Sequence, residues 1–308
     1  MGRARIAVAG AGLMGHAIAQ LFASAGHPVA VYDPDPAALA SLRPRVGAIL
    51  ELLDLDHGAI DRIAPTADLA AAVVDAVFVF EAVAERLEVK QSLFEALDRL
   101  APPQAILASN TSAIPIGAIA ARVRDRARVL GAHFWNPPYA VRLVEVVQAE
   151  ATRPELVART IELLHAAGMS PVHVRRDIPG FIGNRLQHAL KREAIALVAD
   201  GVCDAETLDR VVREGFGARL AVLGPLEQSD LVGLGLTLDI HRVLMPHLDR
   251  TPVAHPYLEA KVAAGELGMT QGAGFRRWTA AEAAAVRDRF RAFQVAQAKA
   301  AAKRPRAT

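Results

Sequence analysis

The sequence predicts an α/β protein in which a doubly wound, mainly parallel sheet is followed by an all-α C-terminal domain. Two patterns carry this prediction. In the first half of the chain, short apolar runs alternate with segments whose apolar residues recur at helical spacing, which is typical of strand–helix–strand units. From Phe181 onward the periodicity is helical, and no convincing strand occurs.

The expected strands are short and apolar, as in a sheet that helices cover on both faces. They lie at Ile6–Ala9, Pro28–Tyr32, Arg62–Pro65, Ala76–Phe80, Ala105–Ala108, Val129–Ala132, Val141–Val147 and Pro171–Val174. Helices are expected at Gly12–Ala25, Pro36–Leu53, Leu87–Leu100, Ile116–Arg122, Pro154–Ala167, Phe181–Ala199, Ala205–Glu214 and Ala280–Lys299. The turn Asp177–Gly180 is the best domain boundary, so we place the two domains at 1–178 and 179–308.

Length, charge and composition exclude several classes of protein. The 308 residues suffice for two ordinary domains, and a net charge of +2 gives no electrostatic case for a nucleic-acid partner. The most apolar long window, 69–84, is interrupted by two acidic residues, and the first apolar run is too short for a secretory signal, so we expect no membrane partner. The single cysteine, Cys203, cannot form an internal disulfide, which favours a cytoplasmic protein.

A glycine-rich segment, Gly10–Gly15, has the spacing G-x-G-x-x-G between an expected strand and an expected helix. In that context the first glycine permits a tight turn, the second lets a pyrophosphate approach the backbone, and the third allows close packing of helix on strand. The start of the helix offers free N–H groups to the phosphates. The segment therefore predicts a Rossmann-type domain, with cofactor contacts at Gly10, Gly12, Leu13, Met14 and Gly15.

Asp33 indicates which dinucleotide is bound. It lies 18 residues after Gly15, at the end of the second expected strand. A carboxylate there accepts hydrogen bonds from a ribose diol and repels a 2′-phosphate, and no arginine directly follows it. We therefore predict NAD as the cofactor; a dehydrogenase that uses NADP is the alternative.

Polar residues cluster after strands where an α/β domain places its chemistry. Ser109–Ser112 follows one expected strand, His133 follows the next, and Glu145 lies in the run after that. Oxidation of an alcohol needs a base, and a neutral imidazole oriented by a carboxylate suits that task at neutral pH. His133 and Glu145 are candidates if their strands bring them together. Spacing alone leaves open a structural histidine and a surface carboxylate.

Five motifs follow one another along the chain, and we compare them as a set: Gly10–Gly15, Ser109–Ser112, His133–Pro137, Leu143–Val147 and Pro179–Arg185. Together they resemble the L-3-hydroxyacyl-CoA dehydrogenase family, and the resemblance covers about residues 4 to 290. It implies an oxidoreductase that moves a hydride between NAD and a secondary alcohol on a small molecule. It also implies a homodimer that forms through the helical domain.

The resemblance assigns roles to individual positions. His133 matches the catalytic base and Glu145 its carboxylate partner. Ser112 and Asn184 match groups that hold the substrate near the reacting carbon, although both residue types also cap helices and turns. The remaining cofactor-side positions that it implies are Glu85, Lys90, Asn110, Ser112 and Asn136. No metal site is predicted.

Three departures from the family pattern concern the substrate. Acyl-CoA members carry a longer, lysine-rich excursion after the second strand, whereas residues 36–61 contain no lysine and only Arg43 and Arg45 as fixed cations. The segment Gly215–Pro225 is longer than in typical acyl-CoA members and is more similar to members that act on L-gulonate, carnitine or pyridine carboxylates. A lysine of the family's C-terminal glycine-rich stretch is replaced by Thr270.

Two substrate classes therefore remain. One is a 3-hydroxyacyl-CoA, which would place the reaction in fatty acid metabolism. The other is a small CoA-free hydroxy acid, whose carboxylate would need a bidentate cation such as Arg219 or Arg142. An exposed arginine without a role is the alternative for Arg219. A non-catalytic NAD-binding protein is the alternative for the whole chain.

Overall fold

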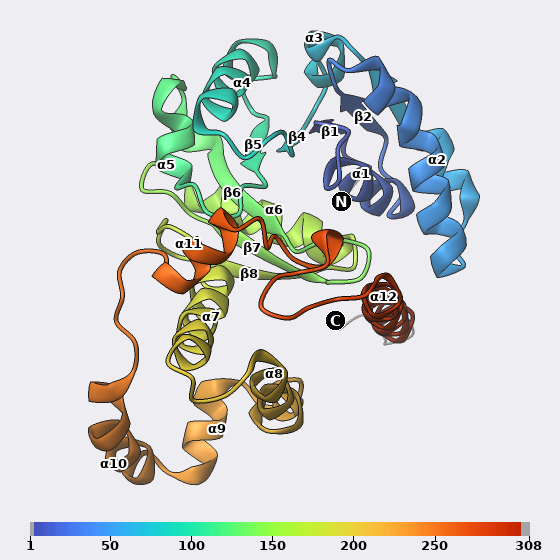
Figure 1. Cartoon of the computed structure of the whole chain (residues 1–308). Coiled ribbons are helices and arrows are strands. Elements are labelled where there is room, and N and C mark those ends of the chain that lie inside the picture. Colours follow the sequence, from blue (N-terminus) through green and yellow to red (C-terminus); the bar gives the residue numbers. More distant parts are fainter. Residues whose placement is uncertain (1–2, 303–308) are drawn as a thin grey trace. The chain divides into compact units, whose positions relative to one another are not determined.

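The computed structural model describes residues 3–302, and its largest feature is an eight-stranded sheet (Figure 1). The strands lie in the order β3-β2-β1-β4-β5-β6-β7-β8. All neighbouring strands run parallel except β6 and β7, which pair antiparallel. The strands are β1 (Ile6–Ala9), β2 (Val29–Tyr32), β3 (Ile63–Thr66), β4 (Phe78–Glu81), β5 (Ile106–Ser109), β6 (Val129–Phe134), β7 (Leu143–Val147) and β8 (Ser170–Val174).

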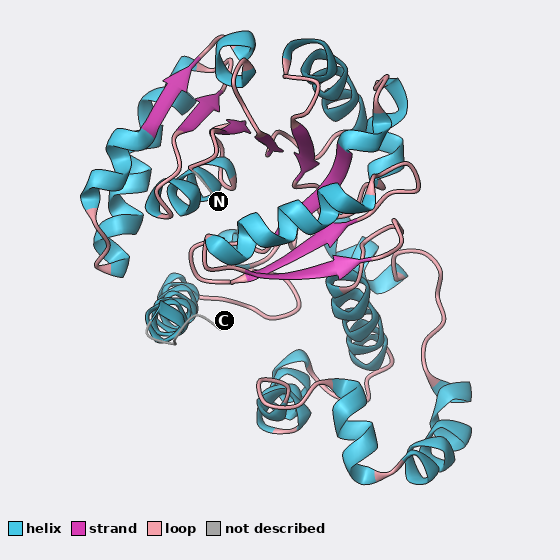
Figure 2. Ribbon diagram, turned by 180° about the vertical axis from the view of Figure 1, so that it is seen from behind, coloured by secondary structure: helices cyan, strands magenta, loops and turns pink. Residues whose placement is uncertain are grey.

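Helices cover both faces of this sheet (Figure 2). Alternate residues of a strand point to opposite faces. On β1, Ile6 and Val8 therefore join one buried apolar cluster and Ala7 joins another. Residues of α1, α2 and α6 complete the first cluster, and residues of α3, α4 and α5 complete the second. The helices are α1 (Gly15–Ser24), α2 (Pro36–Leu53), α3 (Leu69–Val73), α4 (Leu87–Leu100), α5 (Ile116–Ile119) and α6 (Pro154–Ala166).

The chain packs as two compact units. One comprises residues 3–185 together with 290–302, and the other comprises Leu186–Arg289. The second unit is helical: α7 (Gly183–Ala199) leads into it, and α8 (Ala205–Glu214), α9 (Pro225–Val232), α10 (Leu234–Leu244) and α11 (Pro256–Ala263) follow. The last helix, α12 (Ala280–Ala302), starts there, and from Phe290 onward it belongs to the first unit.

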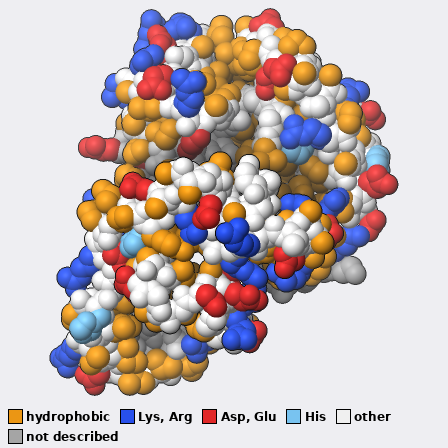
Figure 3. Space-filling model, in the orientation of Figure 1, with side chains coloured by type: hydrophobic (Ala, Val, Ile, Leu, Met, Phe, Trp, Pro, Cys, Tyr) orange, Lys and Arg blue, Asp and Glu red, His pale blue; other side chains and the backbone are white. Residues whose placement is uncertain are grey.

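The helices α9 and α10 expose much apolar surface. Leu226 is 80% exposed and Val243 72%, and apolar side chains gather over these helices in the space-filling view (Figure 3). Leu231, Leu234 and Leu236 are exposed as well. In a globular protein, a continuous exposed apolar surface marks a place where something else binds.

The predicted fold class is confirmed, and most differences concern the ends of elements. Strand β6 runs two residues farther than expected, through His133 and Phe134, because β7 returns antiparallel beside it. The short helices α3, α9, α10 and α11 were not anticipated from the sequence. In the described residues, no helix combines the length and apolarity needed to cross a bilayer.

Candidate active site

The structure brings His133 and Glu145 face to face. The two residues are register partners on the antiparallel strands β6 and β7, so both side chains project from the same face of the sheet. Nδ1 of His133 lies 2.9 Å from Oε2 of Glu145, and both residues are buried. The rings of Trp135 and Phe181 flank the imidazole, with centroids 5.6 and 5.8 Å from its own.

The second carboxylate oxygen of Glu145 is also held. Oε1 accepts hydrogen bonds from the backbone amides of Ile182 and Gly183, at 2.9 and 3.0 Å. Burial raises the pKa of Glu145, but the hydrogen bond with His133 and the two amides outweigh it, so the net pKa lies below its usual value. An ionised Glu145 can only accept a hydrogen bond, so Nδ1 of His133 carries the proton that it donates. Nε2 is then the nitrogen with a free lone pair. In the described part of the chain, Nε2 has no hydrogen-bond partner.

Ser112 is fixed from two sides. Its amide donates to Oε1 of Glu85 at 2.8 Å, and its carbonyl oxygen accepts from Nδ2 of Asn184 at 2.8 Å. Glu85 also accepts from the Thr111 hydroxyl at 2.6 Å. Burial raises the pKa of Glu85, but the Thr111 hydrogen bond and the Lys90 charge outweigh it, and its net pKa lies below the usual value. Ser112 itself is exposed, so its hydroxyl is available to a ligand.

A buried carboxylate that we did not single out as a site residue, Glu81, completes this region. It ends β4, is 0% exposed, and accepts hydrogen bonds from Lys90 Nζ and Ser109 Oγ, both at 2.6 Å. Lys90 also lies 3.2 Å from Glu85. The sequence signal was present: an acidic residue directly ends the apolar run Ala76–Phe80, and a buried carboxylate needs a partner.

The glycine-rich turn between β1 and α1 fits a dinucleotide. A β-carbon on Gly10, whose φ is +107°, would lie 2.6 Å from the Ala82 carbonyl oxygen, and one on Gly15 would overlap the Gly10 carbonyl. At Gly12 a β-carbon would instead project into open space, which a pyrophosphate can use. Beside it, Met14 precedes α1 without any side-chain cap; the His16 amide donates to the Gly12 carbonyl, but no side chain occupies the helix start, where a phosphate can approach.

Asp33 lies against the same turn. Its Oδ2 accepts a hydrogen bond from the Ala11 amide at 2.8 Å, and its Oδ1 accepts from the Asp35 amide at 2.9 Å. Each oxygen keeps a lone pair for a ribose hydroxyl. The chain order also places Asp33 at the end of β2, beside the point where the strand order reverses between β1 and β4. Dinucleotides cross an α/β sheet at that point.

Three predicted residues have other surroundings. The side chain of Asn110 is buried and accepts from the Phe134 amide at 2.8 Å, so it joins β5 to β6. Asn136 lies in the β6–β7 connection, before a cis peptide bond to Pro137. Arg219 ends a short 3₁₀ turn of the second unit; it is exposed and, within the described residues, forms no ion pair.

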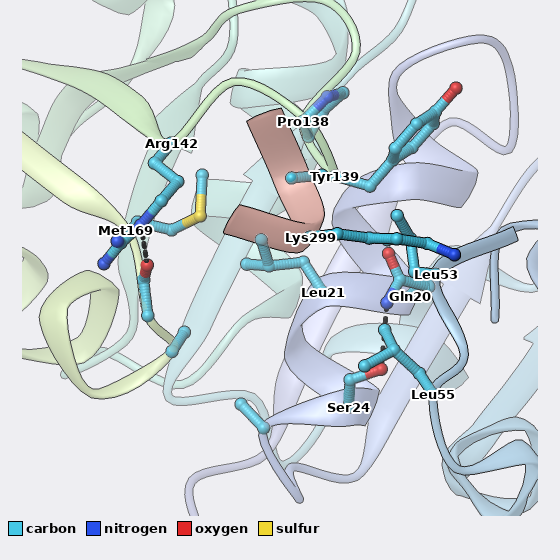
Figure 4. A pocket seen from close by; sticks show the side chains of 14 residues that line it. Gln20, Leu21, Ser24, Leu53, Leu55, Pro138, Tyr139, Arg142, Met169 and Lys299 are labelled. Carbon is cyan, nitrogen blue, oxygen red and sulfur yellow. Dashed lines mark hydrogen bonds between the residues drawn. The ribbon is translucent and has the colours of Figure 1, made fainter. Parts of the chain in front are cut away.

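Arg142 lines a pocket that contains none of the candidate catalytic or cofactor-binding residues. Its Nε donates to the Gly168 carbonyl at 2.7 Å, beside this pocket of about 300 Å³ (Figure 4). Two other polar side chains that line this pocket are paired: Lys299 contacts Asp54 at 2.7 Å, and the Gln20 amide nitrogen donates to Ser24. Because this pocket is separate from the candidate site, we do not propose Arg142 as the carboxylate anchor.

Comparison with known proteins decides the family. The model of the NAD-binding domain of 3-hydroxyacyl-CoA dehydrogenase matches residues 5–178, and the model of its C-terminal domain matches residues 180–278. The chain belongs to the 3-hydroxyacyl-CoA dehydrogenase family. It is an NAD-binding oxidoreductase, as the motifs and the glycine-rich turn predicted.

Relatives within this family have different named substrates. A 5-formyl-3-hydroxy-2-methylpyridine 4-carboxylate 5-dehydrogenase from Mesorhizobium japonicum is 34% identical over 89% of this chain and 90% of its own length. An L-carnitine dehydrogenase from Streptomyces griseus is 37% identical over 80% and 78%. A probable 3-hydroxybutyryl-CoA dehydrogenase from Bacillus subtilis is 39% identical over 88% and 96%.

Two solved structures differ in how much of this chain they cover. The structure of a 5-dehydrogenase of the same pyridine carboxylic acid covers 99% of this chain and 100% of its own, with a TM-score of 0.90 and 33% identity. The (S)-3-hydroxybutyryl-CoA dehydrogenase from Ralstonia eutropha covers 90% of this chain and 100% of its own, with a TM-score of 0.73 and 27% identity. The helix α12 lies beyond the residues that the two family models match.

Proposed function

We propose that this protein oxidises a secondary hydroxyl, at the 3-position of its substrate, to a ketone, with His133 as the general base. The observation that carries the proposal is the buried contact between His133 Nδ1 and the ionised Glu145. A carboxylate in that position fixes the tautomer, directs Nε2 at the hydroxyl proton and stabilises the imidazolium that forms. Bound NAD supplies the acceptor for the hydride.

The other site residues position the substrate. Ser112 presents an exposed hydroxyl from a loop that Glu85 and Asn184 hold at both ends. A hydroxyl and an amide at that place can hold a substrate oxygen beside the reacting carbon. Gly10, Gly12, Gly15 and the amides of Leu13 and Met14 would hold the pyrophosphate, and Asp33 the adenine ribose. We assign Lys90, Asn110 and Asn136 to the support of the nicotinamide side.

For the substrate, we favour a small CoA-free hydroxy acid over a 3-hydroxyacyl-CoA. The pyridine-carboxylate dehydrogenase structure covers the chain almost completely, including the length of α12. Residues 36–61 also lack the lysines that would contact a polyanionic CoA. Arg219 remains our proposed anchor for the substrate carboxylate. If the substrate is a CoA thioester instead, the reaction belongs to fatty acid metabolism.

Organisation and location complete the proposal. We place the nucleotide-binding domain at 1–178 and a helical substrate and dimerisation domain at 179–308. The exposed apolar surface of α9 and α10 supports a homodimer through the helical domain. The free Cys203 supports a cytoplasmic location.

A substrate panel tests the proposal. We would follow NAD reduction with L-carnitine, L-gulonate and free L-3-hydroxybutyrate against L-3-hydroxybutyryl-CoA. The proposal expects turnover with a free acid that exceeds turnover with the thioester. Activity confined to the thioester would overturn the substrate class. Undiminished activity of His133→Gln on any of these compounds would overturn the assignment of the base.

A further inference from the structure

A cluster of three charges, two of them buried, lies on the β4–β5 side of the point where the strand order reverses. Glu81 ends β4, Glu85 follows in the next loop, and Lys90 lies in the first turn of α4. Asp33 and the glycine-rich turn lie on the β1–β2 side of the same point. A dinucleotide that crosses there with its adenine ribose on Asp33 brings its nicotinamide half to the cluster.

The cluster carries one net negative charge. Lys90 Nζ lies 2.6 Å from Glu81 and 3.2 Å from Glu85, so one ammonium group faces two carboxylates. The side chains of Glu81 and Lys90 are 0% and 1% exposed, whereas that of Glu85 is 43% exposed. The neighbouring Arg86 is exposed and forms no ion pair within the described residues. Of the three charges in the cluster, the one that a ligand meets is therefore that of Glu85.

Glu81 determines whether the negative charge of Glu85 acts on a bound ligand or is cancelled by Lys90. Without a buried carboxylate at the end of β4, Lys90 would pair with Glu85 alone and cancel it. With Glu81 in place, the ammonium is already neutralised by the closer carboxylate. Glu81 touches no ligand in this arrangement and acts through Lys90, which makes it a positioning residue.

We infer that Glu81, by neutralising Lys90, shifts the relative affinity of the site toward oxidised NAD and away from NADH. The oxidised nicotinamide ring carries a positive charge and the reduced ring carries none, so a net anion beside the ring favours only the oxidised form. Partial exclusion of water strengthens the effect, because a unit charge at an effective dielectric of about 20 acts over roughly 15 Å. The inference rests on the proposed site to the extent that the nicotinamide lies on the β4–β5 side.

Calorimetric titration of the whole protein with NAD and with NADH, without substrate, tests the inference. Glu81→Gln keeps the shape and, through its one amide oxygen, the hydrogen bond from Lys90; its amide nitrogen must donate to the Ser109 hydroxyl instead of accepting from it, and one negative charge is removed. We expect it to weaken NAD binding about fivefold or more and to change NADH binding by less than about twofold. Glu95→Gln, which removes the same charge from a half-exposed position farther along α4 that pairs with Arg99, is the matched control and should change neither.

A charge-restoring variant separates electrostatics from structural damage. In Glu81→Gln/Lys90→Gln the cluster again carries one negative charge, on Glu85, so the ratio of the two dissociation constants should return toward the wild-type ratio. If Glu81→Gln fails to fold, Glu85→Gln, which removes the exposed charge directly, should show the same selective loss. Equal losses for both nucleotides in Glu81→Gln, or no recovery in the double variant, would overturn the inference.

The role of Glu81 and the proposed reaction can fail independently of each other. The titrations contain no alcohol, so they are independent of His133 and of the substrate class. A protein that turns over a hydroxy acid but binds both nucleotides with an unchanged ratio in all variants keeps its function and refutes the role of Glu81. Wild-type protein that binds neither nucleotide would refute both.

Discussion

Gly183 lies directly against the indole ring of Trp135. A β-carbon at position 183 would overlap Cζ2 of that ring and would lie 3.0 Å from Cη2. The amide of the same glycine donates to Glu145, and the Trp135 ring flanks His133. Position 183 therefore needs a residue without a β-carbon, so that the indole can pack beside His133 while the backbone amide donates to Glu145.

We expect Gly183→Ala to destabilise the protein by about 1–3 kcal/mol, because the indole and the start of α7 must separate. Denaturant unfolding followed by tryptophan fluorescence measures this. Gly235→Ala is the control, because a β-carbon there meets nothing within 4 Å and alanine is a better helix former. Equal stability of Gly183→Ala and the wild type would show that the indole can move without cost.

His133→Gln should reduce kcat about 10²-fold or more, because glutamine cannot accept the hydroxyl proton. The nucleotide turn is distant along the chain and unchanged, so the Kd for NAD should stay within about twofold of the wild-type value. Stopped-flow turnover and calorimetry give the two numbers. A drop in NAD affinity that matches the drop in kcat would place this residue in binding instead.

The stability of the protein should depend on the ionisation of Glu145. Its pKa in the folded state is lowered, so its contribution is fully present above the ordinary glutamate value of about 4.3 and is lost as the pH falls through the folded-state pKa. At pH 7 we expect Glu145→Gln to cost about 1–3 kcal/mol, since it weakens a buried charged hydrogen bond. The difference from the wild type should shrink below about pH 4. A difference that stays constant down to pH 3 would contradict this account.

Asp33→Asn should admit NADP. The asparagine oxygen can still accept from the Ala11 amide, but the charge that repels a 2′-phosphate is gone. We expect the ratio of kcat/KM for NADP over NAD to rise about tenfold or more. Asp35→Asn is the matched control, because Asp35 caps α2 through the Ala37 amide and asparagine caps equally well. The same rise in both variants would point to net charge and not to Asp33.

Local patterns were sufficient for the sheet and the nucleotide turn. The inner strands β1, β4, β5 and β6 are buried throughout and largely apolar on consecutive residues because helices cover both faces, so short apolar runs located them. The edge strands β3 and β8 are partly exposed and carry a weaker signal. Helices α9 and α10 were missed because Gly224, Gly233 and Gly235 border and interrupt this segment, and glycines at such spacing indicate turns.

The pairing across β6 and β7 could not be obtained from spacing. It depends on the antiparallel return of β7, which sets His133 opposite Glu145 and not one residue away. The hydrogen bonds that Glu145 accepts from the amides of Ile182 and Gly183 depend on the path of the chain after β8. Glu81 was missed for a similar reason, because only the tertiary structure shows that Lys90 reaches it from α4.

The two oxygens of Glu145 also set a rule for protein engineering. One oxygen contacts the imidazole of His133. The other accepts hydrogen bonds from the backbone amides of Ile182 and Gly183, where the link to the helical unit begins. A chimera that borrows a relative's helical unit to change specificity should therefore be spliced after Arg185. With a junction placed upstream, inside the 177–180 turn, residues 182 and 183 would come from the relative. The two amides that donate to Glu145 would then belong to a foreign segment, and these hydrogen bonds could be lost.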